Sequence, residues 1–182
     1  ALALIGEVFA DGYVKNAILE FVGQGVHALP AEFRNGIDVM TTETACLSSV
    51  WETDEEIRRY YVRHGRPEAY AQLSPEEGAV YDRAVEIDLS RVAPMIAMPF
   101  HPSLVYKISD VRDNAGDVLR ECEKRAREQL GGVELRLTEK LENGKLRVDQ
   151  GVIAGCAGGT YDNLCAAANI LRGRTIGDGA FT

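Results

Sequence analysis

The segment VIAGCAGGTYDNLCAAANIL constrains the fold more than any other part of the chain. Gly151 to Ala154 predict a buried strand, GCAGG predicts a tight turn, and Thr160 to Leu171 predict a helix. In open α/β sheets, polar groups gather at the carboxyl ends of strands, where loops project them into a crevice. Cys156 occupies such a position, and the amides of the following helix favour its thiolate form. The segment therefore indicates an α/β protein with a candidate metal-binding thiol.

The chain has four cysteines, and none of them forms a CxxC pair. This number is too small for a disulfide scaffold, so reduced thiols or metal ligands are expected, in a cytoplasmic protein. Free cysteines are often buried, which makes a core thiol the alternative interpretation of Cys156. For Cys46, Cys122 and Cys165, a core thiol is the expectation.

Charge and hydropathy exclude several classes of partner. The formal net charge of −8 repels phosphate backbones and anionic lipid, so neither nucleic acid nor a membrane is expected as a partner. No apolar run approaches the roughly 20 residues that span a bilayer. The first residues lack the basic start of a signal peptide, which agrees with the expected cytoplasmic location. The sequence also begins without methionine, inside a predicted helix, which suggests an excised internal fragment.

Hydrophobic periodicity and turn signals predict the remaining elements. Thr53 and Glu56 form a capping box for one helix, and Asn143-Gly144 indicates a hairpin. The expected helices are Ala1–Phe9, Ala31–Thr42, Thr53–His64, Glu68–Leu73 and Ala115–Leu130, and the expected strands are Ala17–Val22, Cys46–Val50, Ala84–Leu89, Met95–Ala97, Val133–Leu137 and Lys145–Val148.

These elements predict a three-layer α/β/α architecture in three parts. Ala1–Val111 form an α/β domain, and Arg112–Lys145 form a charged helix and hairpin that connect it to the next unit. Leu146–Thr182 form the first strand and helix of that second α/β unit, which carries Cys156.

Four segments, in the same order, resemble the aconitase and isopropylmalate isomerase family. AILEFVGQGVHALP is similar to the family's strand ending in Tyr/Phe-x-Gly-x-Gly-Val, and MTTETACLSSVW to its Met-x-x-Glu helix end with the strand beyond. YDRAVEIDLSRVAPMIAMPFHPSLV resembles its Glu-Ile-Asp/Asn-Leu-Ser and Pro-Phe-x-Pro series. The segment around Cys156 resembles its cluster-cysteine turn. The matching residues are Phe21, Gly23, Gly25, Val26, Met40, Glu43, Ser49, Val50, Tyr81, Asp82, Glu86–Ser90, Pro94, Pro99–Pro102, Cys156, Tyr161 and Asp162.

The resemblance implies an iron-sulfur hydro-lyase. Family members hold a 4Fe-4S cluster by three cysteines and leave one iron open as a Lewis acid for a hydroxy-polycarboxylic acid. Cys156 corresponds to the first cluster ligand, and Glu43 to an active-site glutamate. The other two cysteines, the substrate-binding arginines and further domains are expected outside this sequence. The fragment alone is therefore expected to bind no cluster and to be inactive.

Two departures from the family pattern favour a divergent hydratase. Val39 stands where the family usually has Asn, and Ala157-Gly158-Gly159 replace Thr-Asn-Ser after the cysteine. These changes also leave open a catalytically inactive paralogue. A third hypothesis is an anion- or nucleotide-binding module that uses GCAGGT at a helix N-terminus, although the P-loop Lys-Ser/Thr is missing.

Overall fold

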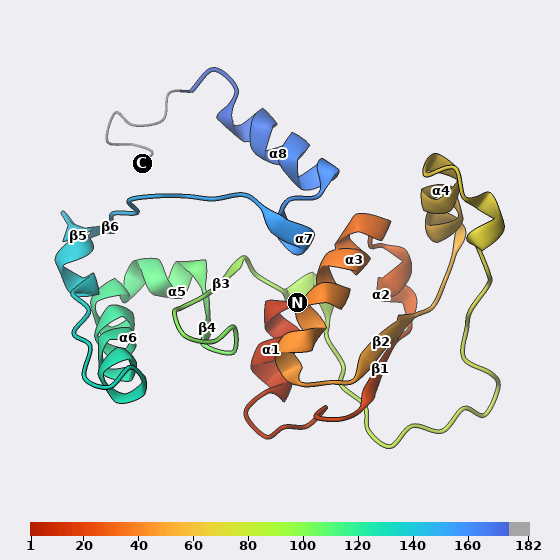
Figure 1. Ribbon diagram of the computed structural model, residues 1–182, viewed down its shortest axis with the longest axis horizontal. Helices are drawn as coiled ribbons and strands as arrows, with labels where there is room; N and C mark the ends of the chain where they lie inside the picture. The colour runs from red at the N-terminus through yellow and green to blue at the C-terminus, as the bar shows by residue number, and fades with distance from the viewer. Residues whose placement is uncertain (175–182) are drawn as a thin grey trace. The chain divides into compact units, whose positions relative to one another are not determined.

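The computed structural model describes residues 1–174, and its α/β character confirms the predicted fold class (Figure 1). The last part of the predicted second unit, residues 175–182, lies outside the described residues. Two compact units can be distinguished, and each is described by itself. Unit 1 contains Ala3–Val92 and Ala154–Asn163, and unit 2 contains Ala93–Ile153 together with residues 164–174.

The described elements alternate between short helices and short strands. The α-helices are α1 (Leu2–Val8), α2 (Gln24–His27), α3 (Ala31–Met40), α4 (Glu55–Arg63), α5 (Ile108–Asp113), α6 (Ala115–Gln129), α7 (Gly155–Gly158) and α8 (Tyr161–Leu171). The 3-10 helices are η1 (Thr41–Thr44), η2 (Pro67–Ala69), η3 (Leu89–Arg91) and η4 (Leu137–Lys140). The strands are β1 (Ile18–Phe21), β2 (Ser48–Trp51), β3 (Met95–Ala97), β4 (Val105–Lys107), β5 (Leu141–Glu142) and β6 (Lys145–Leu146).

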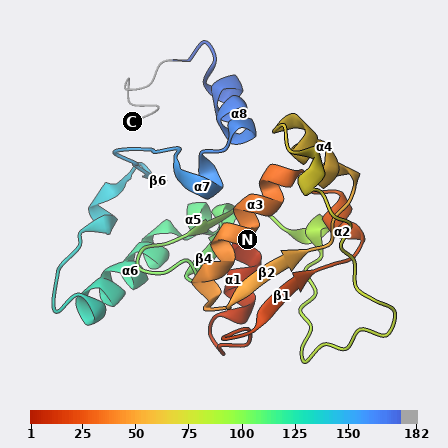
Figure 2. The same cartoon turned by 45° about the vertical axis from the view of Figure 1, so that its right-hand side comes forward.

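Unit 1 is built on the parallel pair β1–β2, whose strands run side by side in Figure 2. Leu19 pairs with Ser49 and Phe21 with Trp51, and these four side chains are the more buried ones of the two strands. Because side chains alternate along a strand, they share one face of the sheet. Leu4 and Val8 of α1 pack on this face together with Val14.

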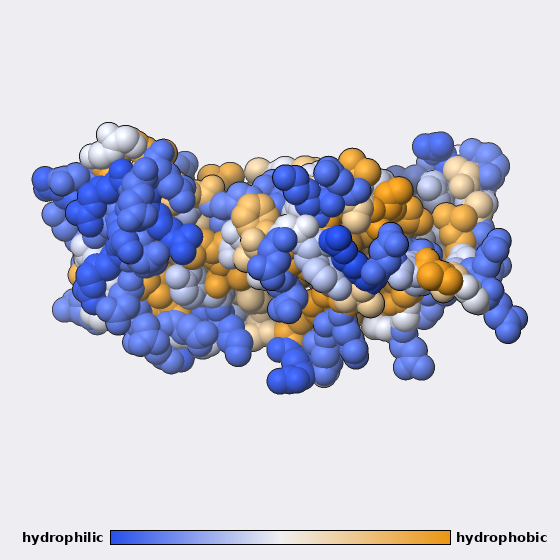
Figure 3. All heavy atoms as spheres, turned by 90° about the horizontal axis from the view of Figure 1, so that it is seen from below, coloured by the Kyte–Doolittle hydropathy of each residue, from blue (hydrophilic) through white to orange (hydrophobic). Residues whose placement is uncertain are grey.

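The opposite face of β1–β2 is exposed within the described residues. Ile18 is 63% exposed and Val50 is 41% exposed. Figure 3 shows that apolar side chains, in orange, also occur among the blue polar ones on one face of the molecule. Parallel sheets are usually covered on both faces, so this face differs from an ordinary parallel sheet.

Asp54, not Thr53, caps α4, so the predicted capping box is wrong. Asp54 has an extended backbone, and its carboxylate accepts hydrogen bonds from the amides of Glu56 and Ile57. The Thr53 hydroxyl is used elsewhere, because it donates to the Ala71 carbonyl and accepts from the Leu73 amide. The helix itself is confirmed.

Unit 2 combines the antiparallel pair β3–β4 with α5 and α6. Its buried core consists of Met98, Val111, Val118, Leu119 and Cys122. The Asn143-Gly144 hairpin is confirmed, with both residues at positive φ as a two-residue turn requires. Its partner strand is Leu141–Glu142 instead of the predicted Val133–Leu137, because a two-residue turn pairs the residues directly beside it.

Two further predicted strands are absent from the described structure. Residues 84–88 are irregular, and Leu89–Arg91 form a 3-10 turn in which the Asp88 carboxylate accepts from the Ser90 amide. Residues 151–154 are exposed and extend without a paired neighbour. A strand requires a hydrogen-bonding partner, which an apolar run by itself does not supply. None of the helices in residues 1–174 is long and apolar enough to cross a membrane.

Candidate functional site

Cys156 lies on the four-residue helical turn α7, and its side chain is exposed. Glycine is required on both sides of it. Gly155 has φ of 82°, a conformation that other residues rarely adopt. A Cβ atom on Gly159 would lie 2.8 Å from the Gly155 carbonyl oxygen, which is closer than real Cβ contacts come. The glycines therefore define the backbone that presents the thiol.

The Cys156 turn packs against α3, beside which α7 lies in Figure 1. A Cβ atom on Gly36 of α3 would be 3.5 Å from the Ala157 carbonyl oxygen, an ordinary van der Waals distance, so the turn lies directly against the helix here. Two hydrogen bonds hold the turn. The Asn163 side-chain amide donates to the Ala157 carbonyl at 3.0 Å, and the Asp162 amide donates to Glu32 Oε2 at 3.0 Å.

Glu43 lies in η1, which continues α3 without a break and ends at Ala45 in the left-handed conformation. Its side chain is half-buried. The Thr41 hydroxyl donates to the Asp38 carbonyl, and the Thr44 hydroxyl donates to the Thr41 carbonyl, each at 2.6 Å. Glu43 and the turn that bears Cys156 are thus both attached to α3, although sequence reasoning assigned them to different domains.

A polar link between α3 and β2 was missed by sequence reasoning. Asp38 Oδ1 accepts hydrogen bonds from the Ser49 hydroxyl and from Trp51 Nε1, the latter at 3.1 Å. The Trp51 ring stacks on Phe21 with centroids 4.1 Å apart. The available signal was an acidic residue in the last turn of an amphipathic helix, one turn beyond Arg34.

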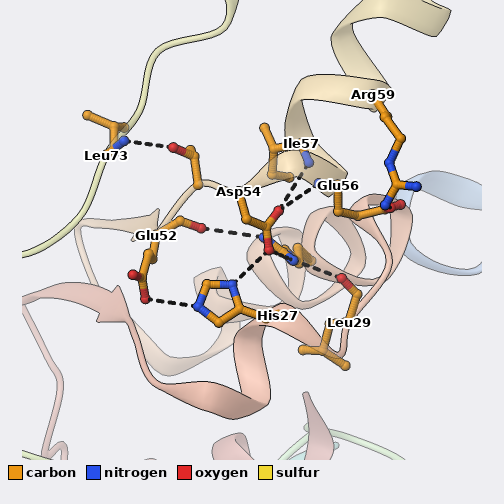
Figure 4. A network of polar contacts seen from close by, with 10 residues as sticks. His27, Leu29, Glu52, Asp54, Glu56, Ile57, Arg59 and Leu73 are labelled. Atoms are coloured by element: carbon orange, nitrogen blue, oxygen red, sulfur yellow. Dashed lines mark hydrogen bonds and ion pairs between the residues drawn. The ribbon is translucent and has the colours of Figure 1, made fainter.

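Arg34 and Asp54 form the centre of a second polar network. Figure 4 shows Asp54 in this network, with His27 and Glu52 beside it. The Arg34 side chain is nearly fully buried and donates to the carbonyls of Leu29 and Glu52 and, at 2.6 Å, to Asp54 Oδ2. His27 Nδ1 donates to the same carboxylate oxygen at 2.9 Å, and its Nε2 lies 3.8 Å from Glu52 Oε2. Sequence reasoning did not predict this network.

The network determines the ionisation of Asp54. Burial alone would raise the pKa of its carboxyl. Hydrogen bonds from Arg34, His27 and the Ile57 amide outweigh this effect and lower the pKa to about 2. Asp54 is therefore a carboxylate throughout the physiological range, and it links α2, α3 and α4.

The other cysteines differ in their exposure. Cys122 is fully buried, as predicted, and Cys46 is half-buried with its thiol donating to the Thr41 carbonyl. The prediction of a core thiol is wrong for Cys165, which is exposed on α8. An alanine-rich helix face is buried only if another element covers it.

The geometry of the turn is compatible with Cys156 as one ligand of an iron-sulfur cluster. The thiol is exposed, and a Cβ atom on Gly155 or Gly158 would meet nothing within 4 Å, so the surroundings of the turn are open. Across residues 1–174, no three His, Cys, Asp or Glu side chains gather as a metal site. The described residues thus offer one thiolate of the set that such a cluster requires.

Nearly the whole chain is similar to known proteins. The chain matches the model of the aconitase family (aconitate hydratase) over residues 1–181. It is 30% identical over 178 residues to a 3-isopropylmalate dehydratase large subunit of Desulfovibrio desulfuricans, covering 98% of this chain and 34% of that protein. It is 27% identical over 175 residues to a 3-isopropylmalate dehydratase large subunit of Clostridium kluyveri, covering 96% of this chain and 34% of that protein. The chain thus spans about a third of the length of these relatives. With nearly all of its residues matched, the chain belongs to the aconitase family.

Proposed function

We propose that the chain is part of a hydro-lyase that adds water to, or removes it from, a hydroxy-polycarboxylic acid. The observation that carries the proposal is the attachment of both candidate site residues to α3. The Cys156 turn packs beside Gly36, and Glu43 follows directly after Met40. A thiolate and a carboxylate supported by one helix are suited to a shared site.

In this proposal, Cys156 is one ligand of a 4Fe-4S cluster completed by cysteines elsewhere in the parent protein. When bound, the cluster supplies a Lewis-acidic iron. Glu43 supports the substrate hydroxyl group that is lost or added and holds its proton. Gly155 and Gly159 keep the thiol in position, while the parent supplies the arginines that bind the substrate carboxylates.

The relatives suggest the first substrate and partner to test. Because they are named 3-isopropylmalate dehydratase large subunits, 3-isopropylmalate is the first substrate, and a complementary small subunit is the first partner, besides the remaining domains of the parent. A cytoplasmic location is part of the proposal, since all four cysteines are free thiols, as expected in a reducing compartment.

The proposal is tested by anaerobic cluster reconstitution of the full parent chain. Cys156→Ser is expected to abolish the stoichiometric binding of iron, whereas Cys165→Ser, an exposed thiol on the adjacent helix, should leave it unchanged. Full iron content in the Cys156→Ser variant would refute the assignment. For the 182-residue chain alone, we expect iron far below one cluster per chain.

Activity of the reconstituted parent is then screened with hydroxy-di- and tricarboxylic acids. Glu43→Gln should lower kcat by about 10²-fold or more while the cluster is retained, since it removes a charged proton-handling group. If the wild-type parent binds a cluster but converts none of these acids, the inactive paralogue becomes the better description. Val39 and Ala157-Gly158-Gly159, which lack the family's polar side chains, favour that alternative.

The anion-binding hypothesis has less support. The Asp162 amide, in the first turn of α8, already donates to the Glu32 carboxylate. A second negative group at this position would be repelled.

A further inference from the structure

We infer that Glu32 is a positioning residue for Cys156, fastening its turn to α3 by capping α8 from another helix. The inference rests on the proposed function for the role of Cys156. The geometry of the turn stands independently of that role.

The first observation is the hydrogen bond between Glu32 and α8. Glu32 Oε2 accepts from the Asp162 amide at 3.0 Å, across 130 positions of sequence. Asp162 is the second residue of α8, and its amide is one of those that an N-terminal capping side chain normally engages. A carboxylate is favourable at this end of a helix because the helix dipole is positive there.

The second observation is that the local capping residue is not used. Thr160 immediately precedes α8 and is of a type preferred for capping. Its hydroxyl oxygen is nevertheless buried and has no hydrogen-bond partner. Glu32 therefore performs, from α3, the function that Thr160 would ordinarily perform within its own helix.

The third observation is that the fastening acts on the thiol-bearing turn. The Asn163 side chain, next to Asp162, donates to the Ala157 carbonyl and closes the turn from the α8 side. On the other side, the Ala157 backbone lies against Gly36 of α3. The backbone between Gly155 and Asn163 is thus held at its beginning by packing and at its end by Glu32. Loss of Glu32 should release the end that follows Cys156.

The test compares variants of the full parent chain by hydrogen exchange, without a cluster. Glu32→Ala is expected to speed exchange in the peptide covering residues 155–163 by about tenfold, the effect of losing one charge-assisted hydrogen bond. Glu32→Gln, which keeps an acceptor oxygen without the charge, should give a smaller increase. Asn35→Ala, an exposed change on the same helix, should give none.

A second readout follows the metal site. After reconstitution, Glu32→Ala should lose iron to a chelator several-fold faster than wild type, and Glu32→Gln should lie between the two. Unchanged exchange in Glu32→Ala, with the same circular dichroism spectrum as wild type, would overturn the inference. Exchange in Thr160→Val that is as fast as in Glu32→Ala would also overturn the inference, because Thr160 would then be the residue that caps α8.

The outcomes also separate this inference from the proposed function. If Cys156→Ser retains its iron, the functional assignment fails whatever Glu32 does. If Cys156→Ser loses iron but Glu32→Ala behaves as wild type, only the role of Glu32 is wrong.

Discussion

The two units differ in how far polar interactions enter their interior. In unit 1, an apolar cluster joins α1 to the sheet, but the fully buried side chains also include Arg34 and Thr44, and hydrogen bonds centred on Asp54 and Asp38 join further elements. In unit 2, the buried residues are apolar, with Leu119 and Cys122 at the centre. Its ion pairs, such as those of Arg147, are exposed.

The difference shows where each unit is vulnerable. Removing the partner of a buried charge lowers the free energy of unfolding more than removing an apolar contact does. An exposed ion pair contributes little to this free energy. Hydrogen bonds and ion pairs also have direction, so they suit the unit that, in the proposed function, holds Cys156 and Glu43 in fixed positions. An apolar core requires only volume and shape.

The largest expected effect is in unit 1. Arg34→Ala leaves the carbonyls of Leu29 and Glu52 and the Asp54 carboxylate short of a donor, and it should lower the free energy of unfolding by about 4 kcal/mol. The measurement is urea unfolding followed by the fluorescence of Trp51, which lies in the same unit. If Arg34→Ala lowers the free energy of unfolding by less than Leu119→Ala in the core of unit 2 does, the proposed difference between the two units is wrong.

In unit 2, Leu119→Ala should cost about 3 kcal/mol, because it opens a cavity beside Val118 and Cys122. Circular dichroism of the helices during urea unfolding measures this loss. Leu119→Met, which conserves volume, is the matched control and should cost much less. Equal losses in both variants would mean that the core is not tightly packed.

Acid should weaken unit 1 through Asp54. Its pKa falls from the ordinary 3.8 to about 2 in the folded state, which corresponds to about 2 kcal/mol. Because the folded pKa is the lower one, this stabilisation is complete above about pH 4 and disappears as the pH falls toward 2. Unfolding of wild type and Asp54→Asn across this range measures the effect. The difference between them should shrink on acidification, and a constant difference would argue against the carboxylate.

The smallest effect is expected for Arg147→Ala in unit 2. Arg147 pairs with Glu142 and Asp149, all on the surface around the β5–β6 hairpin. Water and salt screen such pairs, so the urea midpoint should remain within experimental scatter of wild type at low and high salt. A shift as large as that of Arg34→Ala would show that exposed ion pairs stabilise unit 2 after all.

Local signals predicted several of the individual elements. Helices such as α3 and α6, the strand β3 and the Asn143-Gly144 turn were recognised because periodicity and turn chemistry act within a few residues. The strands expected at 84–89 and 151–154 do not form, because a strand must pair with a segment that is distant in sequence and local signals do not identify that segment. The roles of Cys156 and Glu43 came from family resemblance and remain predictions.

The sequence by itself determined the α/β class, the family and the glycine turn around Cys156, because these depend on residue type, order and backbone freedom. Tertiary structure alone decided that Arg34 and Asp38 are ties inside unit 1, that Cys165 is exposed, and that Glu32 caps a helix 130 positions away. The physical reason is that hydrogen-bond partners and burial are properties of neighbours in space. No periodicity along a chain records which neighbours folding will bring together.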